Sequence, residues 1–284
     1  GSITASNVYS AKPYAIRTMN KSAKECRFSM VNDIHGRDSM LIALTKNVKT
    51  DRPDFMVFNG DMVDFMGSQK DLEEKFLKRS SELFATDIPL VYVRGNHETR
   101  GNMARSYDEY IHNTRDGKYY GVYYCGDTAV IMLDSGEDKL DSHEVYAGFT
   151  AFDEYRLEQV EWLKQVIKSK EFRKAKNRIV MLHIPPAVEA MKAQNEKQVA
   201  SMLEWHGNAH WGEILLPLLN KADIDLMISA HQHRFGLYTP QKGVIEFPLV
   251  INDNNSAMFV RSSDDGVSVK ITNKEGKELL NRTF

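Results

Sequence analysis

The chain has 284 residues, enough for one large domain or two ordinary ones. Hydrophobic residues make up 42% of it and charged residues 27%, which is typical of a globular protein that folds in water. The formal net charge of -2 argues against broad attraction to nucleic acid or an anionic membrane, and no apolar run approaches the roughly 18 residues of a membrane span.

Apolar runs of strand length alternate along the chain with stretches in which apolar residues recur at helical spacing. The expected strands cover residues 27–33, 54–61, 88–93, 129–134, 178–183 and 225–231. The expected helices cover residues 69–85, 153–169 and 207–220. Alternation of this kind predicts a largely α/β architecture.

The last part of the chain has a different pattern. Short strand patterns follow one another at residues 244–252, 257–263 and 267–273, and the turn signal "NKEG" comes before a further apolar pair. Short strands joined by tight turns favour antiparallel pairing. We therefore expect an antiparallel meander that closes the fold.

The sequence predicts a short N-terminal extension followed by one domain. Gly1 and Ser2 are typical of residues left by a cloning site, so a signal peptide or a preceding domain would lie upstream of them. We expect residues 1–24 to be an N-terminal extension and residues 25–284 a single domain, because no repeat, low-complexity tract or linker divides the chain. The cysteines, Cys26 and Cys125, match no zinc-ligand spacing and should pack as small apolar side chains.

Polar residues gather where five of the expected strands end. These clusters are residues 32–36, 59–64, 94–98, 183 and 231–233. In open α/β sheets, ligands bind outside the carboxyl ends of the strands, so side chains far apart in the sequence can meet there. The sequence therefore predicts one site built from several strand ends.

The residue types in these clusters suit a pair of divalent metal ions. Imidazole and carboxylate together favour zinc, iron or manganese, whereas a thiolate site would need cysteines at the strand ends. Asp33 and His35 are two residues apart, so in an extended chain both side chains point the same way, and the pair at 231 and 233 has the same spacing. Asp61, in a glycine-flexible turn, is the natural candidate for a carboxylate that bridges two cations.

The ordered set D-x-H, G-D-x-x-D, G-N-H-E, a lone histidine and H-x-H over residues 33–233 resembles the calcineurin-like metallophosphoesterase superfamily. The resemblance implies that residues 25–284 form a two-sheet β-sandwich flanked by helices, an α/β/β/α arrangement, with a dinuclear metal site at one edge. It implies a first metal held by Asp33, His35, Asp61 and His233. It implies a second metal held by Asp61, Asn96, His183 and His231, with Asp61 bridging.

The resemblance also implies a reaction, the hydrolysis of a phosphate mono- or diester with two manganese, iron or zinc ions as cofactors. Two cations about 3.5–4 Å apart would clamp the phosphoryl oxygens and lower the pKa of a bound water toward roughly 7, so that the resulting hydroxide attacks phosphorus. The leaving oxygen then needs a proton. His97 directly follows a metal ligand and is expected to donate it, oriented by Asp64, similar to the His–Asp pair of phosphoprotein phosphatases.

Two departures from related branches of the superfamily bear on the substrate. Phe65 stands where phosphoprotein phosphatases carry an arginine that grips phosphate, which favours a small ester over a phosphoprotein. Asp64 stands where purple acid phosphatases carry a tyrosine, so no coloured iron–tyrosinate is expected. The stretches "LDSG" and "HIPP" nevertheless look most like secreted bacterial members near the purple-acid branch, which favours a secreted or periplasmic location.

Other residues are candidates for the substrate side. Arg37 could reach a phosphate, with a solvated surface arginine as the alternative. His206 and His210 could line the site, with a helix-capping loop packed by tryptophans as the alternative. Residues 137–152 form a long loop of the kind that often acts as a lid.

Two further histidines fall outside the clusters at the strand ends. His112 and His143 are expected to be surface residues.

One competing function is a non-catalytic scaffold of the same fold, which would be expected to lack ligands or His97. The other is a nuclease of the same superfamily, but no basic groove with interleaved aromatics is present in the sequence.

Overall fold

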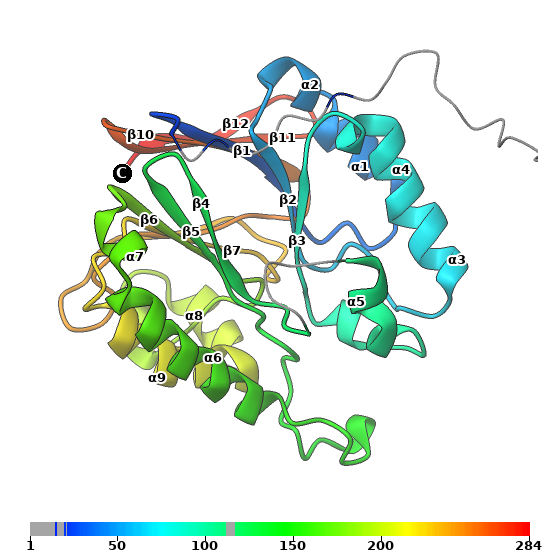
Figure 1. The fold of residues 1–284 in the computed structure, drawn as a ribbon. Coiled ribbons are helices and arrows are strands. Elements are labelled where there is room, and N and C mark those ends of the chain that lie inside the picture. The colour runs from blue at the N-terminus through cyan, green and yellow to red at the C-terminus, as the bar shows by residue number, and fades with distance from the viewer. Residues whose placement is uncertain (1–14, 16–19, 21, 112–116) are drawn as a thin grey trace, which may run out of the picture.

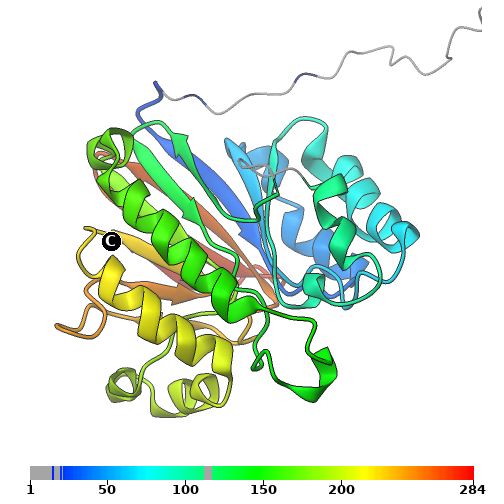
Figure 2. The same ribbon diagram turned by 60° about the horizontal axis from the view of Figure 1, so that its bottom comes forward.

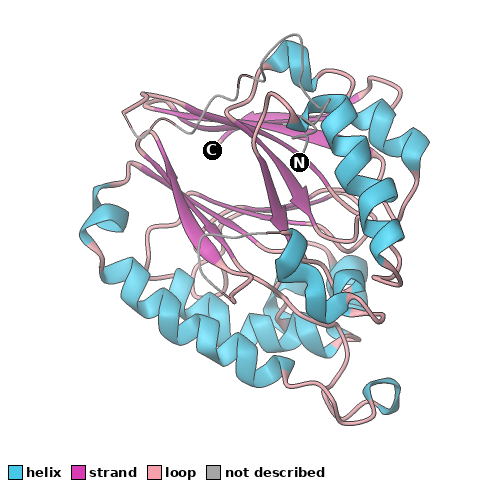
Figure 3. Ribbon diagram, turned by 45° about the vertical axis from the view of Figure 1, so that its right-hand side comes forward, coloured by secondary structure: helices cyan, strands magenta, loops and turns pink. Residues whose placement is uncertain are grey.

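The computed structural model describes residues 15, 20, 22–111 and 117–284, so most of the expected N-terminal extension and His112 lie outside the described residues. Two six-stranded sheets pack against each other, and helices lie on the outer sides of the sandwich (Figures 1 and 3). This arrangement confirms the predicted two-sheet sandwich flanked by helices.

The first sheet combines parallel and antiparallel strands. Its strands, in the order β12-β11-β10-β1-β2-β3, are β12 (Glu278–Thr283), β11 (Gly266–Asn273), β10 (Ser256–Ser263), β1 (Cys26–Val31), β2 (Phe55–Asn59) and β3 (Leu90–Val93). Strands β1, β2 and β3 run parallel, whereas β10, β11 and β12 form the expected antiparallel meander. All five residues of β2 are buried, as expected for a strand covered on both faces.

The second sheet is parallel in its centre. Its strands, in the order β4-β5-β6-β7-β9-β8, are β4 (Gly121–Cys125), β5 (Thr128–Met132), β6 (Asn177–Met181), β7 (Leu226–Ser229), β9 (Leu249–Ile251) and β8 (Gly236–Tyr238). The expected assignment of residues 244–252 to the meander was wrong, because β9 pairs parallel to β7 in this second sheet. All three residues of β9 are buried, and such a continuous apolar run suits a strand covered on both faces.

Helices of the N-terminal half pack beside β1, β2 and β3. They are α1 (Asp38–Thr45), α2 (Val48–Asp51), α3 (Gln69–Leu72), α4 (Lys78–Ser80) and α5 (Tyr107–Tyr110). The expected helix at 69–85 is present, but it alternates between α and π hydrogen bonding, with π segments at Glu73–Leu77 and Ser81–Ala85. Short 3-10 turns follow at His97–Thr99 and Ala104–Ser106.

Helices of the C-terminal half cover the second sheet. They are α6 (Phe152–Lys168), α7 (Lys170–Lys174), α8 (Glu196–Leu203) and α9 (His206–Leu219), with 3-10 turns at Glu144–Tyr146 and Glu189–Ala193. Helices α6 and α9 lie side by side (Figure 2), close to the expected ranges 153–169 and 207–220. None of the helices among the described residues has both the length and the apolar character needed to span a bilayer.

The main core lies between the two sheets. Phe28 and Phe55 from the first sheet pack with Val130, Ile179 and Ile228 from the second. Cys26 and Cys125 belong to the same cluster and are buried, as predicted. This rigid interior fixes the positions at which the strands end, and therefore the positions of the polar loops that follow them.

Candidate metal centre

All seven predicted metal ligands lie together at the carboxyl ends of β1, β2, β3, β6 and β7. Two of the groups whose ligand atoms lie within 4.8 Å of one another are Asp33 with His35 and His233, and Asp61 with His183 and His231. Asn96 joins the second group, because its side-chain oxygen lies 3.2 Å from Nδ1 of His231 and 3.3 Å from Oδ2 of Asp61. The two groups contain the residues that the resemblance assigns to each metal, except that Asp61, the predicted bridge, belongs only to the second group.

The backbone of this site is unusually strained. Five of the seven candidates have a positive φ, namely Asp33 (51°), His35 (51°), Asp61 (54°), His231 (67°) and His233 (51°). Non-glycine residues rarely adopt this region, and it costs on the order of 1–3 kcal/mol each. The reasoning from an extended chain at Asp33 and His35 was therefore wrong, since a left-handed turn brings these side chains together. Such strain persists only where the surrounding structure holds it, and it clusters at functional sites.

Main-chain hydrogen bonds between neighbouring loops hold the strained turns. The amide of Asp33 donates to Gly60 O at 2.9 Å, and the amide of His35 donates to Asp61 O at 2.9 Å. A Cβ on Gly60 would lie 2.4 Å from Nδ1 of His183, and one on Gly95 would lie 2.3 Å from Oδ1 of Asp61. Both positions therefore require glycine for the loops to approach this closely.

Glu98 holds the loops around the centre through hydrogen bonds, a role that the sequence did not predict. Its buried carboxylate accepts hydrogen bonds from the tyrosine hydroxyl of Tyr92 (2.6 Å) and from the amides of Gly95 (2.8 Å) and Asp61 (2.9 Å). It also accepts from the amides of Met62 (2.8 Å) and Val63 (3.3 Å). One carboxylate thus ties the loop after β2 to the loop after β3. The sequence signal was the fourth position of the G-N-H-E motif.

Hydrogen bonds fix which ring nitrogen of two histidines faces the centre. Nδ1 of His183 lies 2.7 Å from Asn59 O and must donate its proton there, which leaves Nε2 facing Asp61 Oδ2 at 3.1 Å. Nδ1 of His35 lies 3.0 Å from Oδ1 of Asp64, which turns Nε2 toward Asp33 and His233. A metal-binding histidine has this arrangement, with its second nitrogen held by a carbonyl or carboxylate.

The polar atoms inside the centre need a positive charge. Oδ1 of the buried Asp33 has no hydrogen-bond partner, although Nε2 of His233 lies 3.1 Å away. The Asn96 amide can donate to Nδ1 of His231 and Oδ2 of Asp61 and accept from Arg100, 2.9 Å away, or turn its oxygen toward the centre, where it could bind a cation. Burial lowers the pKa of His183, but the carboxylates of Asp61 and Asp33 outweigh it and raise that pKa to about 10. These donor atoms fit a pair of metal ions that accept imidazole and carboxylate ligands.

His97 stands at the open side of the centre. Its Nδ1 lies 2.9 Å from the main-chain oxygen of Asp64, and its Nε2 lies 3.3 Å from Nη1 of Arg100 and 3.9 Å from Oδ2 of Asp61. The Asp64 carboxylate contacts His35 instead, so the contact that orients His97 differs from the expected one. The Asp64 carbonyl thus contacts Nδ1 of His97, while its carboxylate hydrogen-bonds His35 and lies within 4.8 Å of a ring nitrogen of His97.

A cavity of about 520 Å³ reaches the centre through Arg100, whose Nη1 lies 3.3 Å from Nε2 of His97, although neither His97 nor any of the seven ligand candidates lines it. Its lining includes Phe65, Thr99, Arg100, Glu137, Val145 and Tyr146. Phe65 is 58% exposed at the rim. Arg100, which the sequence analysis did not single out, is held by Glu137 at 2.7 Å and Asp138 at 3.5 Å. The predicted loop at 137–152 forms one wall and projects beside the start of α6 (Figure 2).

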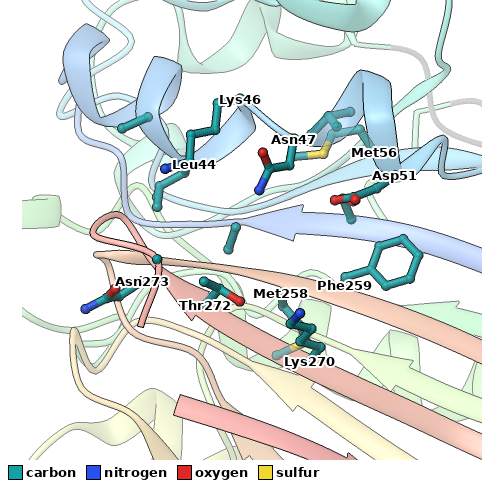
Figure 4. Close-up of a pocket in the computed structure, with 15 residues that line it drawn as sticks. Leu44, Lys46, Asn47, Asp51, Met56, Met258, Phe259, Lys270, Thr272 and Asn273 are labelled. Atoms are coloured by element: carbon teal, nitrogen blue, oxygen red, sulfur yellow. The ribbon is translucent and has the colours of Figure 1, made fainter. Parts of the chain in front are cut away.

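Three other sequence candidates lie outside this cavity. The Arg37 guanidinium donates to main-chain oxygens, those of Asp33 (2.7 Å) and Ile34 (2.9 Å), and therefore braces the ligand loop. His206 and His210 lie at the start of α9 against Asp153. A separate cavity of about 340 Å³ lies between α1 and α2 and the strands β10 and β11 (Figure 4), and none of the seven ligand candidates lines it.

The fold is that of the metal-dependent phosphoesterases. Residues 26–235 match the profile of the family described as calcineurin-like phosphoesterase, and the chain belongs to this family. This membership confirms the resemblance that the ordered motifs predict. A comparison with curated proteins found no match.

Solved structures share the fold at low sequence identity. A purple acid phosphatase from yellow lupin (Lupinus luteus) seeds has a TM-score of 0.65 at 12% identity, covering 92% of this chain and 54% of the lupin chain. This chain thus spans about half the length of the lupin protein. A dimetal phosphatase from Danio rerio has a TM-score of 0.64 at 14% identity, covering 91% of this chain and 99% of that one. GAP50, the anchor in the inner membrane complex of Plasmodium, has a TM-score of 0.56 at 14% identity, covering 92% and 89%.

Proposed function

We propose that the protein hydrolyses a small phosphate ester, mono or di, at a dinuclear metal centre. One ion is held by Asp33, His35, Asp61 and His233, and the other by Asp61, Asn96, His183 and His231. The observation that carries this proposal is the convergence of these seven side chains, among which the buried Oδ1 of Asp33 has no hydrogen-bond partner. Imidazole with carboxylate favours manganese, iron or zinc as the bound ions.

The bound ions would supply Lewis-acid activation of water and neutralise charge that develops on the phosphoryl oxygens. Asp61 is the proposed bridge; its Oδ2 lies 3.1 Å from Nε2 of His183 and 3.9 Å from Nε2 of His97. Its Oδ1 accepts a hydrogen bond from the amide of His97 at 2.9 Å. The same carboxylate therefore fixes the distance between the metal centre and the residue proposed to move a proton.

His97 is the proposed general acid for the leaving oxygen. The Asp64 carbonyl lies 2.9 Å from Nδ1, so it holds the ring through an N–H donor and leaves Nε2 to face the substrate. The imidazole is 24% exposed, which keeps it within reach of a bound ester. Arg100, whose charge is balanced by Glu137, lies with Nη1 3.3 Å from Nε2 of His97 and is proposed to contact the phosphate.

The cavity next to Arg100 supports an ester with an apolar or ring-bearing leaving group. Phe65 and Val145 give it apolar walls, whereas Thr99, Arg100 and Glu137 provide a small number of polar contacts. Ligand sites for small molecules commonly combine these features. We therefore expect aryl or nucleoside phosphates to be better substrates than phosphoserine peptides.

The test is reconstitution of metal-free protein with Mn²⁺, Zn²⁺ or Fe²⁺, followed by assays on 4-nitrophenyl phosphate and its bis-aryl diester. We expect activity to return with bound metal, and Asp61→Asn to lower metal content and activity together. Metal-loaded, folded protein without turnover on either ester would instead support the non-catalytic scaffold. Faster cleavage of single-stranded nucleic acid than of either ester would support the nuclease.

A further inference from the structure

A second cluster of metal-ligand side chains lies outside the dinuclear centre, where the first turns of α6 and α9 meet. Oδ1 of Asp153 lies 2.8 Å from Nε2 of His206 and 2.8 Å from Nδ1 of His210. The two histidines are four residues apart on one helix, so they share a face, and their rings stack with centroids 5.2 Å apart. The ligand atoms of all three residues lie within 4.8 Å of one another, as in the dinuclear centre.

One nitrogen in this cluster has no hydrogen bond. Nδ1 of His210 is buried without a partner, even though the Asp153 carboxylate is 2.8 Å away, because the ring does not point an N–H bond at that oxygen. Oδ1 of Asp33 shows the same feature next to His233 in the dinuclear centre. A cation bound by both the ring nitrogen and the carboxylate would give this buried nitrogen a partner, since both atoms are zinc ligands.

The charges around the cluster suit a divalent cation. Arg156 donates to Oδ1 of Asp153 at 2.6 Å, but its guanidinium is also bound by the main-chain oxygens of Ser135 and Glu137. Oδ2 of Asp153 is hydrogen-bonded to Nε2 of His206 at 2.9 Å, and a bound cation would replace this contact. The carboxylate of Asp141 caps the start of α6, accepting from the amides of residues 152 and 153, and adds a second negative charge.

We propose that Asp153, His206 and His210 bind a third metal ion, a divalent cation such as Zn²⁺, with solvent completing the coordination. Two imidazoles and one carboxylate form a common zinc ligand set, and Zn²⁺ accepts four ligands of these kinds. The carboxylate and both rings are partly exposed, so an ion can enter from solvent. Neither this site nor its test depends on the hydrolytic function proposed for the dinuclear centre.

Such an ion would stabilise one wall of the substrate cavity. The amide of Gly207, next to His206, donates to Asp138 O at 2.8 Å, and a Cβ on Gly207 would lie 2.7 Å from Glu137 O. Glu137 and Asp138 are the residues that hold Arg100. Metal binding at the start of α6 and α9 therefore fixes the main chain that carries both partners of Arg100.

The test is the number of Zn²⁺ ions that stay bound to the full chain after metal removal, reloading with Zn²⁺ alone and gel filtration. We expect three ions per chain in the unsubstituted protein and two in a His206→Ala/His210→Ala variant. His143→Ala, a histidine outside both clusters, is the matched control and should keep three. Asp61→Asn should lose ions from the dinuclear centre but keep the third, which separates failure of one site from failure of the other.

Two results would overturn the proposal. One is two ions per chain in the unsubstituted protein, and the other is an unchanged count in the double variant. If the double variant does not fold, Asp153→Asn and His206→Gln, which keep polar groups of similar shape, should each lower the affinity for the third ion about 10-fold or more. Unchanged affinity in both of these variants would equally contradict the site.

Discussion

His97 is held by the main chain of Asp64 and not by its carboxylate: the Asp64 carbonyl lies 2.9 Å from Nδ1 of His97, while Oδ1 lies 3.0 Å from Nδ1 of His35. The carboxylate is thus positioned to act on a metal ligand, and the carbonyl on the proposed acid. Because a side-chain substitution keeps the carbonyl, the two roles of Asp64 can be separated by experiment.

Asp64→Ala should therefore weaken metal binding more than it slows turnover. Loss of a carboxylate behind a ligating histidine typically lowers metal affinity about 10–100-fold. We expect kcat of Asp64→Ala to stay within a few-fold of the unsubstituted value once saturating metal is supplied. The measurement is activity as a function of free metal concentration. A large loss of kcat that metal does not restore would show that the carboxylate orients His97.

His97→Ala should leave metal content intact. Removal of a general acid lowers turnover about 10²–10⁴-fold, and the loss should be largest for esters whose leaving group is a poor one. The measurement is kcat on an alkyl and an aryl phosphate, together with the bound metal per chain. Loss of metal in this variant would make His97 a ligand and would contradict its role as the acid.

Glu98→Gln should destabilise the centre although it removes no ligand. Each carboxylate oxygen of Glu98 accepts from two main-chain N–H groups. The NH₂ group of glutamine, in either orientation, would therefore face two N–H donors that lose their acceptor. A buried donor left without an acceptor costs about 1–3 kcal/mol. We expect a lower thermal midpoint and weaker metal binding by calorimetry, with Glu204→Gln, an exposed glutamate, as the control. Equal behaviour of the two variants would show that Glu98 does not hold the loops.

Phe65 should decide between leaving groups. Phe65→Ala removes an apolar wall of the cavity next to Arg100, so kcat/KM for an aryl ester should fall about 10-fold more than for methyl phosphate, a difference of about 1.4 kcal/mol. Phe65→Arg should raise activity on phosphoserine peptides relative to aryl esters. Leu157→Ala, an exposed apolar residue on α6, is the control. Strong preference of the unsubstituted protein for phosphopeptides would contradict this role.

The sequence by itself predicted most of the strands and the gathering of the candidate ligands at one edge. Runs such as the five buried residues of β2 are local signals of a covered strand, and a polar residue directly after such a run must lie at the end of that strand. Asp33, Asp61 and His183 could therefore be assigned to one edge without knowledge of the pairing. The family motifs carry the same information because each motif is a strand end with its loop.

Only the tertiary structure decided which side chains meet across loops. The Asp64 carboxylate hydrogen-bonds His35, whereas its carbonyl contacts His97, and these three residues come from three different loops. Strand β9 belongs to the second sheet because its three residues are buried there on both faces, which short patterns in the C-terminal sequence do not reveal. Asp153 meets His206 and His210 because α6 packs on α9. The local sequence shows where a strand ends and a polar loop begins. Which polar loops touch one another depends on how distant parts of the chain pack.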